Sequence, residues 1–284
     1  MRLKPAIDAA YELLVANDVP SPRLNAELLM MFVLGRERAY LYAHPERELS
    51  AEEQYRYDQV IRERAQGCPT QYITGHQEFW GLDLLVSPAV LIPRPETEHV
   101  VETVLDLVKD FPPESAGKLR IVDVGTGSGC IALALASELP QAEVHASDIS
   151  PEALEIARVN AARFAMDSRI RFRKSDLLAA FPLDTFDFVV SNPPYVGELE
   201  ADKVQKQVRE YEPRIAVFSG EQGLDVYRRL IPQARAALKP GGWLVVEIGF
   251  STEASVKELL TGWEDVRVTP DLQGIPRVIA ARKP

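Results

Sequence analysis

The chain has 284 residues, 46% of them hydrophobic, and its 32 Lys and Arg against 42 Asp and Glu give a formal net charge of −10. This length predicts about two globular domains, and the acidic balance argues against a sequence-independent grip on nucleic acid, which needs a basic face. The two cysteines and four histidines show no metal-ligand spacing, and no apolar stretch approaches the roughly 20 residues of a membrane span, so we expect a cytoplasmic protein without metal or disulfides.

The N-terminal stretch carries only helical signals. Ser21 before Pro22 predicts the start of one helix, and Ser50 with Glu53 predicts a capping box at the start of another. Apolar residues at helical spacing are expected to form a shared core: Ile7, Tyr11, Leu14, Val15, Leu24, Leu28, Met31, Phe32, Tyr57, Val60 and Ile61. We predict a small helical domain over residues 1–68, with substrate recognition as its proposed role.

Gly and Pro interrupt the helical periodicity over residues 69–93, and residues 79–86 have the pattern of short strands. We therefore expect a β-hairpin linker in this range. Pro95 then favours the start of a helix. Arg94, held between two prolines, is a candidate for contact with a bound ligand.

Strand and helix patterns alternate through the rest of the chain. Strands are expected at 119–124, 143–147, 169–174, 186–191, 243–248, 265–269 and 277–282, and helices at 96–109, 129–138, 151–165, 223–238 and 252–260. Such alternation favours a mostly parallel sheet covered by helices on both faces. Because the connection from Pro270 to Pro276 is too short for a helical crossover, the last two strands should be antiparallel. We predict an α/β, Rossmann-like domain with a seven-stranded sheet over residues 94–284.

A glycine-rich loop follows the first of these strands and contains Gly125, Thr126, Gly127, Ser128 and Gly129. Glycines let the backbone turn tightly and come close to a ligand. The spacing differs from the Gly-x-Gly-x-x-Gly of dinucleotide sites, because Cys130 takes the place of the last glycine. Asp123 ends the strand, where a carboxylate repels a pyrophosphate but attracts a cationic amine. The loop therefore fits S-adenosylmethionine, which joins an amino-acid head to an adenosine tail.

Acidic residues follow the next two strands. Asp148 lies 23 residues beyond Gly125, about the spacing at which a carboxylate accepts from ribose hydroxyls in Rossmann-type sites. Asp176 and Leu177 follow the third strand, where they can meet the edge and face of an adenine. Either acid alone is commonplace after a strand. The glycine loop, Asp148 and Asp176 follow successive strands in this order, which indicates a single cofactor site. Asn192 is expected to contact the cofactor as well.

The apolar run 186–190 predicts a buried strand that ends at Asn192-Pro193-Pro194-Tyr195. The two prolines fix an extended turn at the strand end where open α/β sheets bind ligands. The Asn192 side chain and the Pro193 main chain offer two carbonyl acceptors, and Tyr195 offers a flat face. Together they suit a planar NH₂ group, either an amide or the exocyclic amine of adenine or cytosine. We predict catalytic roles for Asn192, Pro193 and Tyr195, and substrate contacts for all four residues.

Residues 119–195 resemble class I S-adenosylmethionine-dependent methyltransferases, and the proline turn resembles the amino-methyltransferase motif of that class. Phe-Trp-Gly at 79–81, Leu-Ile-Pro-Arg-Pro-Glu-Thr-Glu at 91–98 and the stretch 211–225 are similar to the PrmC/HemK family. The resemblance implies methylation of the side-chain amide nitrogen of the glutamine in the Gly-Gly-Gln motif of class 1 peptide chain release factors. It implies S-adenosyl-L-methionine as donor, S-adenosyl-L-homocysteine as product and release factors as partners. A monomer without direct nucleic-acid contact is expected.

Other functions remain open at this point. An adenine-N6 methyltransferase acting on DNA or RNA would bind the same kind of amine, although the net charge disfavours it. A glutamine methyltransferase acting on a ribosomal protein would use the same turn. A non-catalytic S-adenosylmethionine-binding module is the third alternative, which an intact turn beside an intact loop disfavours. A group of basic residues lies among acids at Lys203, Lys206, Arg209 and Arg214. These residues form either a solvated face or a rim that contacts the substrate protein.

Overall fold

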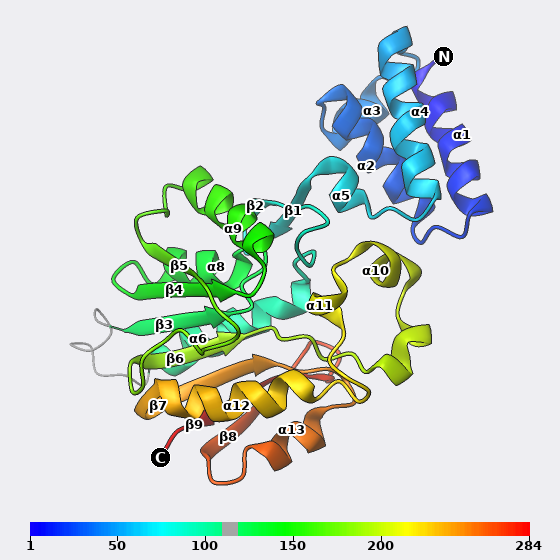
Figure 1. Cartoon of the computed structure of the whole chain (residues 1–284). Helices are drawn as coiled ribbons and strands as arrows, with labels where there is room; N and C mark the ends of the chain where they lie inside the picture. Colours follow the sequence, from blue (N-terminus) through cyan, green and yellow to red (C-terminus); the bar gives the residue numbers. More distant parts are fainter. Residues whose placement is uncertain (110–118) are drawn as a thin grey trace. The chain divides into compact units, whose positions relative to one another are not determined.

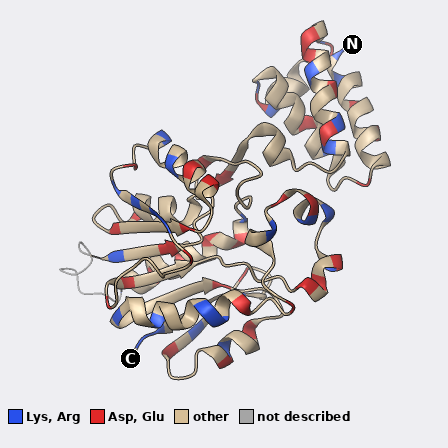
Figure 2. Cartoon of the chain, in the orientation of Figure 1, with Lys and Arg blue, Asp and Glu red and all other residues tan. Residues whose placement is uncertain are grey.

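The structure is a computed structural model that describes residues 1–109 and 119–284. Its described residues form two compact units, Met1–His76 and Gln77–Pro284 (Figure 1). Acidic and basic residues are interspersed along the elements of both units (Figure 2). Within the described ranges no helix is long and apolar enough to cross a membrane, and no group of three or more His, Cys, Asp or Glu is placed to hold a metal ion.

The larger unit is built on a single main sheet. Its strands are β3 (Arg120–Val124), β4 (Glu143–Asp148), β5 (Ile170–Lys174), β6 (Phe186–Ser191), β7 (Leu238–Glu247), β8 (Glu264–Pro270) and β9 (Pro276–Arg282). In the described part of the chain they form a seven-stranded sheet of order β5-β4-β3-β6-β7-β9-β8. Strands β3 to β7 pair in parallel, and β9 is antiparallel to both β7 and β8. The predicted sheet and its antiparallel last strand are confirmed, although β7 begins earlier than residue 243.

Helices connect these strands, and a hairpin precedes them. The helices are η1 (Pro95–Thr97), α6 (Glu98–Val108), α8 (Cys130–Glu138), α9 (Pro151–Arg163), η2 (Glu198–Lys203), α10 (Lys206–Tyr211), α11 (Arg214–Val217), α12 (Asp225–Ala237) and α13 (Glu253–Leu259). The short strands expected over residues 79–86 correspond to β1 (His76–Phe79) and β2 (Leu82–Leu85), which form a two-stranded sheet, although β1 begins earlier than expected. The loop residues Trp80 and Gly81 have φ of +54° and +71°, as the tight turns of two-residue hairpins require.

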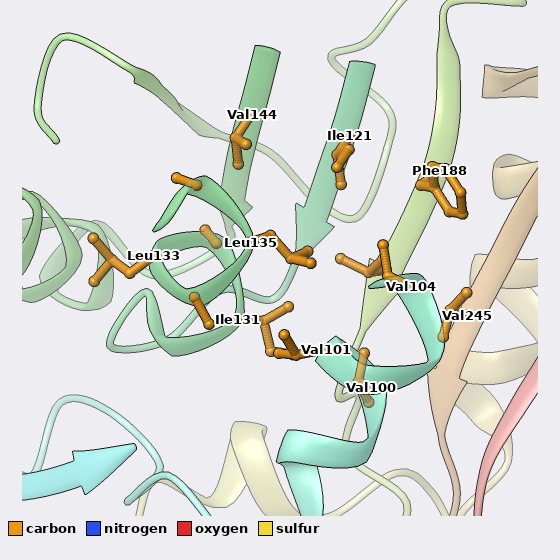
Figure 3. Close-up of a cluster of buried hydrophobic side chains, with 14 of the residues drawn as sticks. Val100, Val101, Val104, Ile121, Ile131, Leu133, Leu135, Val144, Phe188 and Val245 are labelled. Carbon is orange, nitrogen blue, oxygen red and sulfur yellow. The ribbon is translucent and has the colours of Figure 1, made fainter. Parts of the chain in front are cut away.

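Two apolar layers enclose the sheet, because buried side chains point alternately to its two faces along each strand. Helices α6 and α8 cover one face, where Ile121, Val144 and Phe188 are packed (Figure 3). Helices α12 and α13 cover the other, where Val122 and Val189 are packed. Consecutive residues of β3 and of β6 thus belong to opposite layers, which fixes the register of both strands.

The smaller unit is helical in its described secondary structure, apart from one isolated bridge and His76, the first residue of β1. Its helices are α1 (Leu3–Ala16), α2 (Pro22–Leu34), α3 (Arg38–Ala43), α4 (Ala51–Ala65) and α5 (Thr70–Thr74). The capping box of α4 is confirmed, since Ser50 Oγ accepts from Glu53 N and Glu53 Oε2 accepts from Ser50 N. Ser21 does precede α2, but its φ of +50° is left-handed and its side chain makes no capping bond. The short helix α5 was not expected, because Gly and Pro flank it.

The core of the smaller unit differs in part from the prediction. Ile7, Leu14, Tyr57 and Ile61 are buried as expected. The residues Tyr11, Val15, Leu24, Leu28 and Phe32 are instead exposed, and α2 buries Ala26, Leu29, Met30 and Val33. Helix α2 is apolar on more than one face, so periodicity alone could not identify the packed one. The small Ala26 lies on the packed face, and its carbonyl accepts from the Tyr57 hydroxyl at 2.9 Å.

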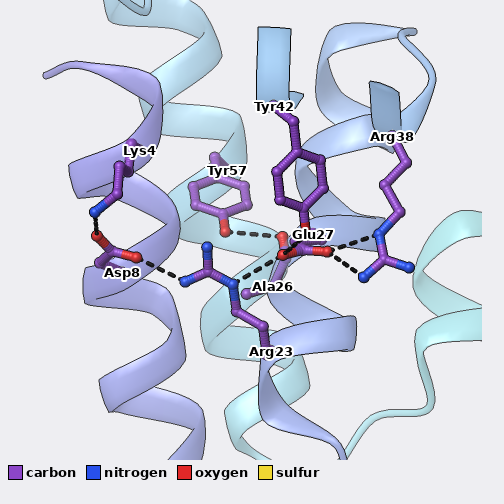
Figure 4. A network of polar contacts seen from close by, with 8 residues as sticks. All are labelled: Lys4, Asp8, Arg23, Ala26, Glu27, Arg38, Tyr42 and Tyr57. Atoms are coloured by element: carbon purple, nitrogen blue, oxygen red, sulfur yellow. Dashed lines mark hydrogen bonds and ion pairs between the residues drawn. The ribbon is translucent and has the colours of Figure 1, made fainter. Parts of the chain in front are cut away.

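A network of polar contacts around a buried acid links three helices of the smaller unit (Figure 4). Glu27 has a side chain that is 2% exposed. It accepts from Arg23 and Tyr42 through Oε1 and from Arg38 through Oε2. Arg23 also binds Asp8 of α1. Burial alone would raise the pKa of Glu27, but these donors outweigh it and hold the pKa below its ordinary value.

Candidate active site

A cavity lies at the carboxyl ends of the central strands. The chain runs from β3 outward to β4 and β5 and then crosses to β6 on the other side of β3. A reversal of this kind opens a crevice beyond the strand ends. The cavity there contains about 1080 Å³ of space, part of it in the open mouth. The glycine loop, the residues after β4 and β5, and the turn after β6 line it, together with residues between 89 and 97 and between 213 and 216.

The glycine loop presents bare backbone to this cavity. Gly125 N donates to Ser147 O at the end of β4 at 2.8 Å. Gly125 and Gly127 have φ of +73° and +56°, and a Cβ on either would meet no heavy atom within 4 Å. A ligand can therefore approach both closely. Gly129 is not in the cavity lining; it begins α8 with φ +86°, and a Cβ there would lie 3.2 Å from Ala157 Cβ, so it serves close packing instead.

Asp148 lies where the sequence predicted an acid beside the loop. Its Oδ2 accepts from Gly127 N and its Oδ1 from Ser150 N, both at 2.9 Å. These bonds hold the loop in shape, and each carboxylate oxygen has a further lone pair for a ligand hydroxyl. Burial raises the pKa of Asp148 above its ordinary value.

The other predicted acid, Asp176, also lines the cavity, together with Leu177. Asp176 Oδ2 accepts from Arg229 Nη2 of α12 at 2.5 Å, and Arg229 is a lining residue too. A ligand amine that binds the Asp176 carboxylate therefore has to share it with Arg229. No local pattern in the sequence indicates this partner, which lies 53 residues further along the chain.

The proline turn contributes only part of itself to the cavity. Asn192 and Pro194 are lining residues, whereas Pro193 and Tyr195 are not. The Tyr195 ring packs against the apolar layer under α12. Gly249 makes room for this ring, since a Cβ there would lie 2.8 Å from Tyr195 Cδ2. The structure thus brings Asn192 to the same cavity as the glycine loop and the two acids, and it leaves Pro193 and Tyr195 outside the lining.

Two buried residues that sequence reasoning missed hold Asn192 in place. Asn192 Nδ2 donates to Thr97 Oγ1 at 2.9 Å, and Thr97 Oγ1 donates to Glu247 Oε2 at 2.6 Å. Thr97 and Glu247 are each 1% exposed. One signal for Glu247 was available, since it is a charged residue within the apolar strand expected at 243–248. Thr97 gave no separate signal in the sequence.

Arg94 turns towards a third residue that was missed. Arg94 Nη2 donates to Glu212 Oε1 at 2.5 Å, and Ile92 N donates to Glu212 Oε2 at 3.1 Å. The Glu212 side chain is 1% exposed. It therefore joins the segment before η1 to the segment before α11, both of which contribute to the cavity wall. Arg94 itself is not in the lining.

Two carboxyl groups near the cavity are poised to change charge near neutral pH. Burial raises the pKa of Asp123 to about 7, although the hydrogen bond from the Thr126 hydroxyl opposes the shift. Burial also raises the pKa of Glu247 to about 7, against hydrogen bonds from Thr97 and Tyr195. Asp123 lies near the end of β3 and Glu247 ends β7, with β6 between these two strands. Neither residue is in the cavity lining, so both carboxyl groups lie behind its wall.

Solved structures with a similar fold support the architecture. The catalytic domain of hMettl16 in complex with MAT2A 3′UTR hairpin 6 has a TM-score of 0.57 at 23% identity, covering 78% of this chain and 81% of that chain. The N-terminal domain of human METTL16 in complex with SAH has a TM-score of 0.52 at 21% identity, covering 79% and 82%. At these identities the likeness concerns the fold, which is that of class I methyltransferases.

Sequence comparisons identify the family. Residues 6–75 match the model of the PrmC N-terminal domain, and residues 103–210 match that of the methyltransferase small domain. The release factor glutamine methyltransferase of Koribacter versatilis (strain Ellin345) is 58% identical and covers 100% of this chain and 99% of that protein. Its namesake in Moorella thermoacetica is 43% identical, covering 99% and 98%. The resemblance to the PrmC/HemK family is confirmed, and the chain belongs to the release factor glutamine methyltransferase family.

Proposed function

We propose that this chain methylates the side-chain amide nitrogen of the glutamine in the Gly-Gly-Gln motif of class 1 peptide chain release factors. S-adenosyl-L-methionine is the methyl donor and S-adenosyl-L-homocysteine the product. Membership of the family and the names of its relatives support this. The observation that carries it is Asn192, whose amide nitrogen is engaged by Thr97, so that its carbonyl oxygen remains available to the cavity.

The cavity residues fit S-adenosylmethionine. The open space over Gly125 and Gly127 admits a close approach of the ligand to the loop backbone. Asp148 would accept from the ribose hydroxyls, and Asp176 with Leu177 would meet the adenine. When bound, the cofactor supplies a methyl group activated by a sulfonium. Thr126, Ser128 and Asn192 would complete its contacts.

The protein's task in this chemistry is to hold a poor nucleophile in line. The lone pair of an amide nitrogen is delocalised into its carbonyl, and the two N–H bonds of the substrate need acceptors. Asn192 Oδ1 and the Pro193 carbonyl would accept from them and aim the nitrogen at the methyl group. Positioning of this kind can contribute about 7–11 kcal/mol to lowering the barrier, and acceptors fixed in advance add electrostatic stabilisation. Pro194, which lines the cavity, would pack on the substrate amide, and Tyr195 would do so where the amide extends beyond the lining.

A methyl-transfer assay with labelled S-adenosylmethionine and a purified class 1 release factor tests the proposal. We expect one methyl group on the glutamine of Gly-Gly-Gln, located by mass spectrometry. A release factor with that glutamine changed to alanine is the matched control and should take up no label. Release factor that stays unlabelled under conditions where the chain binds the cofactor would refute the proposed substrate.

The same assay separates the alternatives. DNA, RNA and ribosomal proteins are offered in parallel with the release factor. Label on adenine would indicate an adenine-N6 methyltransferase, and label on a ribosomal glutamine would keep the reaction but change the substrate. The acidic net charge of −10 and the interspersed charges of Figure 2 favour a protein substrate over nucleic acid.

A further inference from the structure

The side chain of Asn192 is the end of a buried chain of hydrogen bonds. The chain runs from Asn192 Nδ2 to Thr97 Oγ1 and from Thr97 Oγ1 to Glu247 Oε2. It joins three parts of the larger unit that are far apart in sequence, namely the turn after β6, the η1 helix and the end of β7. Glu247 also hydrogen-bonds the side chain of Tyr195. Both ends of the proline turn are thus tied to one carboxyl group that does not line the cavity.

The chemistry of this chain fixes which way the Asn192 amide faces. A threonine hydroxyl has one hydrogen, and an ionised carboxylate can only accept. The Thr97 hydrogen therefore goes to Glu247, and Thr97 Oγ1 can only accept from its other neighbour. The Asn192 amide must then turn its NH₂ towards Thr97 and leave its carbonyl oxygen for the substrate. The opposite orientation would set an NH₂ donor against the NH₂ donor of a substrate amide.

We propose that Glu247 is a positioning residue that holds Asn192, through Thr97, in the orientation that accepts a substrate amide. The role assigned to Asn192 rests on the proposed function. When Glu247 is protonated it can donate to Thr97, and the Thr97 hydrogen can then turn to the Asn192 carbonyl oxygen. The amide flips, and the site loses its acceptor. Protonation of Glu247 therefore switches Asn192 from an accepting to a donating state.

The surroundings of Glu247 place this switch near neutral pH. Burial is the main reason that its pKa rises to about 7. Glu96 of η1 raises it further, whereas Arg277 of β9 lowers it and is itself paired with Asp271. The Tyr195 side chain bonds the carboxyl group, and the Tyr227 hydroxyl of α12 donates to the Glu247 main-chain oxygen. The Cys130 thiol of α8 is a further titratable neighbour, and burial raises its pKa to about 12, so it stays neutral.

Nuclear magnetic resonance tests the switch without any substrate. The chain contains four asparagines, at positions 17, 25, 160 and 192, so ¹⁵N-asparagine labelling gives few side-chain signals, and Asn192→Ser identifies the one of interest. We expect the Asn192 NH₂ signal of the wild type to shift between pH 5.5 and 8.5 with a midpoint near the pKa of Glu247. The signal should not titrate in Glu247→Gln or in Thr97→Val. A titration that persists in both variants would overturn the proposal.

Kinetics at saturating cofactor and release factor provide the second readout. At pH 8 we expect Glu247→Gln and Thr97→Val to lower kcat roughly 10- to 100-fold, the size of loss that follows misplacement of a reacting group, with little change in cofactor affinity. Thr97→Ser, which restores the hydroxyl, should recover most of that rate. The difference in kcat between wild type and Glu247→Gln should narrow towards pH 5.5, because Glu247 of the wild type is then protonated and uncharged, like the glutamine of the variant. A constant gap would indicate a merely structural role and contradict the switch.

Thr103→Val is the matched control for Thr97→Val. Thr103→Val removes a buried hydroxyl of α6, which donates to His99 O at 2.7 Å, and should leave kcat unchanged. If the wild type fails to label release factor, the proposed function fails while the asparagine signal still decides the positioning role. If the wild type labels release factor and Thr97→Val does so at the same rate, the positioning role fails and the proposed function stands.

Discussion

At the scale of single residues, the proposed function depends most on Asn192 Oδ1, which accepts a hydrogen bond from the substrate amide. Asn192→Asp keeps the size of the side chain but replaces its NH₂ by a carboxylate oxygen that faces Thr97 Oγ1, 2.9 Å away. Thr97 cannot donate to this carboxylate and to Glu247 together, so the turn is pushed from its place. We expect a loss of kcat of roughly 100- to 1,000-fold, as for removal of a key polar group from a transition-state site.

Binding of S-adenosylmethionine, measured by calorimetry, separates this effect from a damaged fold. Asn192 is one contact among many in the cavity, so the dissociation constant for the cofactor should change only a few-fold. An Asn192→Asp chain that methylates release factor at the wild-type rate would contradict the role assigned to Asn192.

The buried carboxyl of Asp123 makes stability depend on pH. Its pKa is about 7 in the folded protein against an ordinary value of 3.8, so the folded state retains a proton that the unfolded state releases between these values. Its contribution to the free energy of unfolding is therefore lost as pH rises through this window. Asp123→Asn cannot titrate, so its stability relative to wild type should improve by on the order of 2 kcal/mol between pH 5 and 8.

Tryptophan fluorescence in denaturant measures the free energy of unfolding of the larger unit, because all three tryptophans, Trp80, Trp243 and Trp263, lie in that unit. Burial lowers the pKa of His145, so its contribution to stability increases as pH rises. His145 is present in both wild type and Asp123→Asn, so this contribution cancels in the difference between their free energies of unfolding. Parallel stability profiles for wild type and Asp123→Asn would show that Asp123 keeps its ordinary pKa.

The site residues that could be predicted from the sequence are those that belong to short motifs at the ends of strands. The glycine loop, Asp148 and Asn192 each lie at the end of a strand, and Gly125 to Ser128, Asp148 and Asn192 do line one cavity. Thr97 and Glu247 lie 95 and 150 positions from their partners. A hydrogen bond over such a separation exists only after the sheet has formed, and no local pattern encodes it.

At the scale of elements, Glu212 joins two segments of the cavity wall. Its carboxylate accepts from both Arg94 and Ile92 N, and in Glu212→Gln one of these donors would face an NH₂ group. Leaving a buried donor unpaired costs about 1–3 kcal/mol, so we expect cofactor affinity to fall roughly tenfold. The elements η2 and α10 should also open more often.

Limited trypsin digestion measures that opening at the exposed lysines of these elements, Lys203 and Lys206. Glu212→Gln should be cleaved several-fold faster than wild type, and saturating cofactor should slow the cleavage. Glu210→Gln, two residues away on an exposed position of α10, is the matched control. Equal cleavage and equal affinity in the two variants would show that Glu212 does not hold the wall together.

Helix faces were the elements least predictable from sequence. Strand and helix patterns alternate along the chain regularly enough to predict a mostly parallel sheet, and the short connection from Pro270 to Pro276 predicted the last antiparallel pair. In α2, by contrast, Leu24, Leu28 and Phe32 repeat at the same helical spacing as the buried Leu29 and Val33. Two apolar faces of similar strength leave the choice to tertiary packing, which here selects the face that carries Ala26.

At the scale of the whole molecule, the two units have separate cores and can have separate tasks. The apolar core of Met1–His76 is drawn from its own helices, and every residue named in the candidate site belongs to Gln77–Pro284. We therefore expect a fragment of residues 77–284 to bind S-adenosylmethionine within about threefold of the intact chain. Its kcat/KM for an intact release factor should fall roughly 100-fold or more, because contact through two linked surfaces raises affinity by about 10²- to 10⁴-fold.

A short peptide with the Gly-Gly-Gln sequence separates recognition from chemistry in this experiment. The peptide is too small to use a second surface, so the fragment and the intact chain should methylate it with similar kcat/KM. The prediction concerns the ratio of the two substrates, which cancels any difference in the amount of active protein. If the fragment loses the same factor on peptide and release factor, the N-terminal unit contributes to the catalytic unit itself, and substrate recognition has to be sought in Gln77–Pro284.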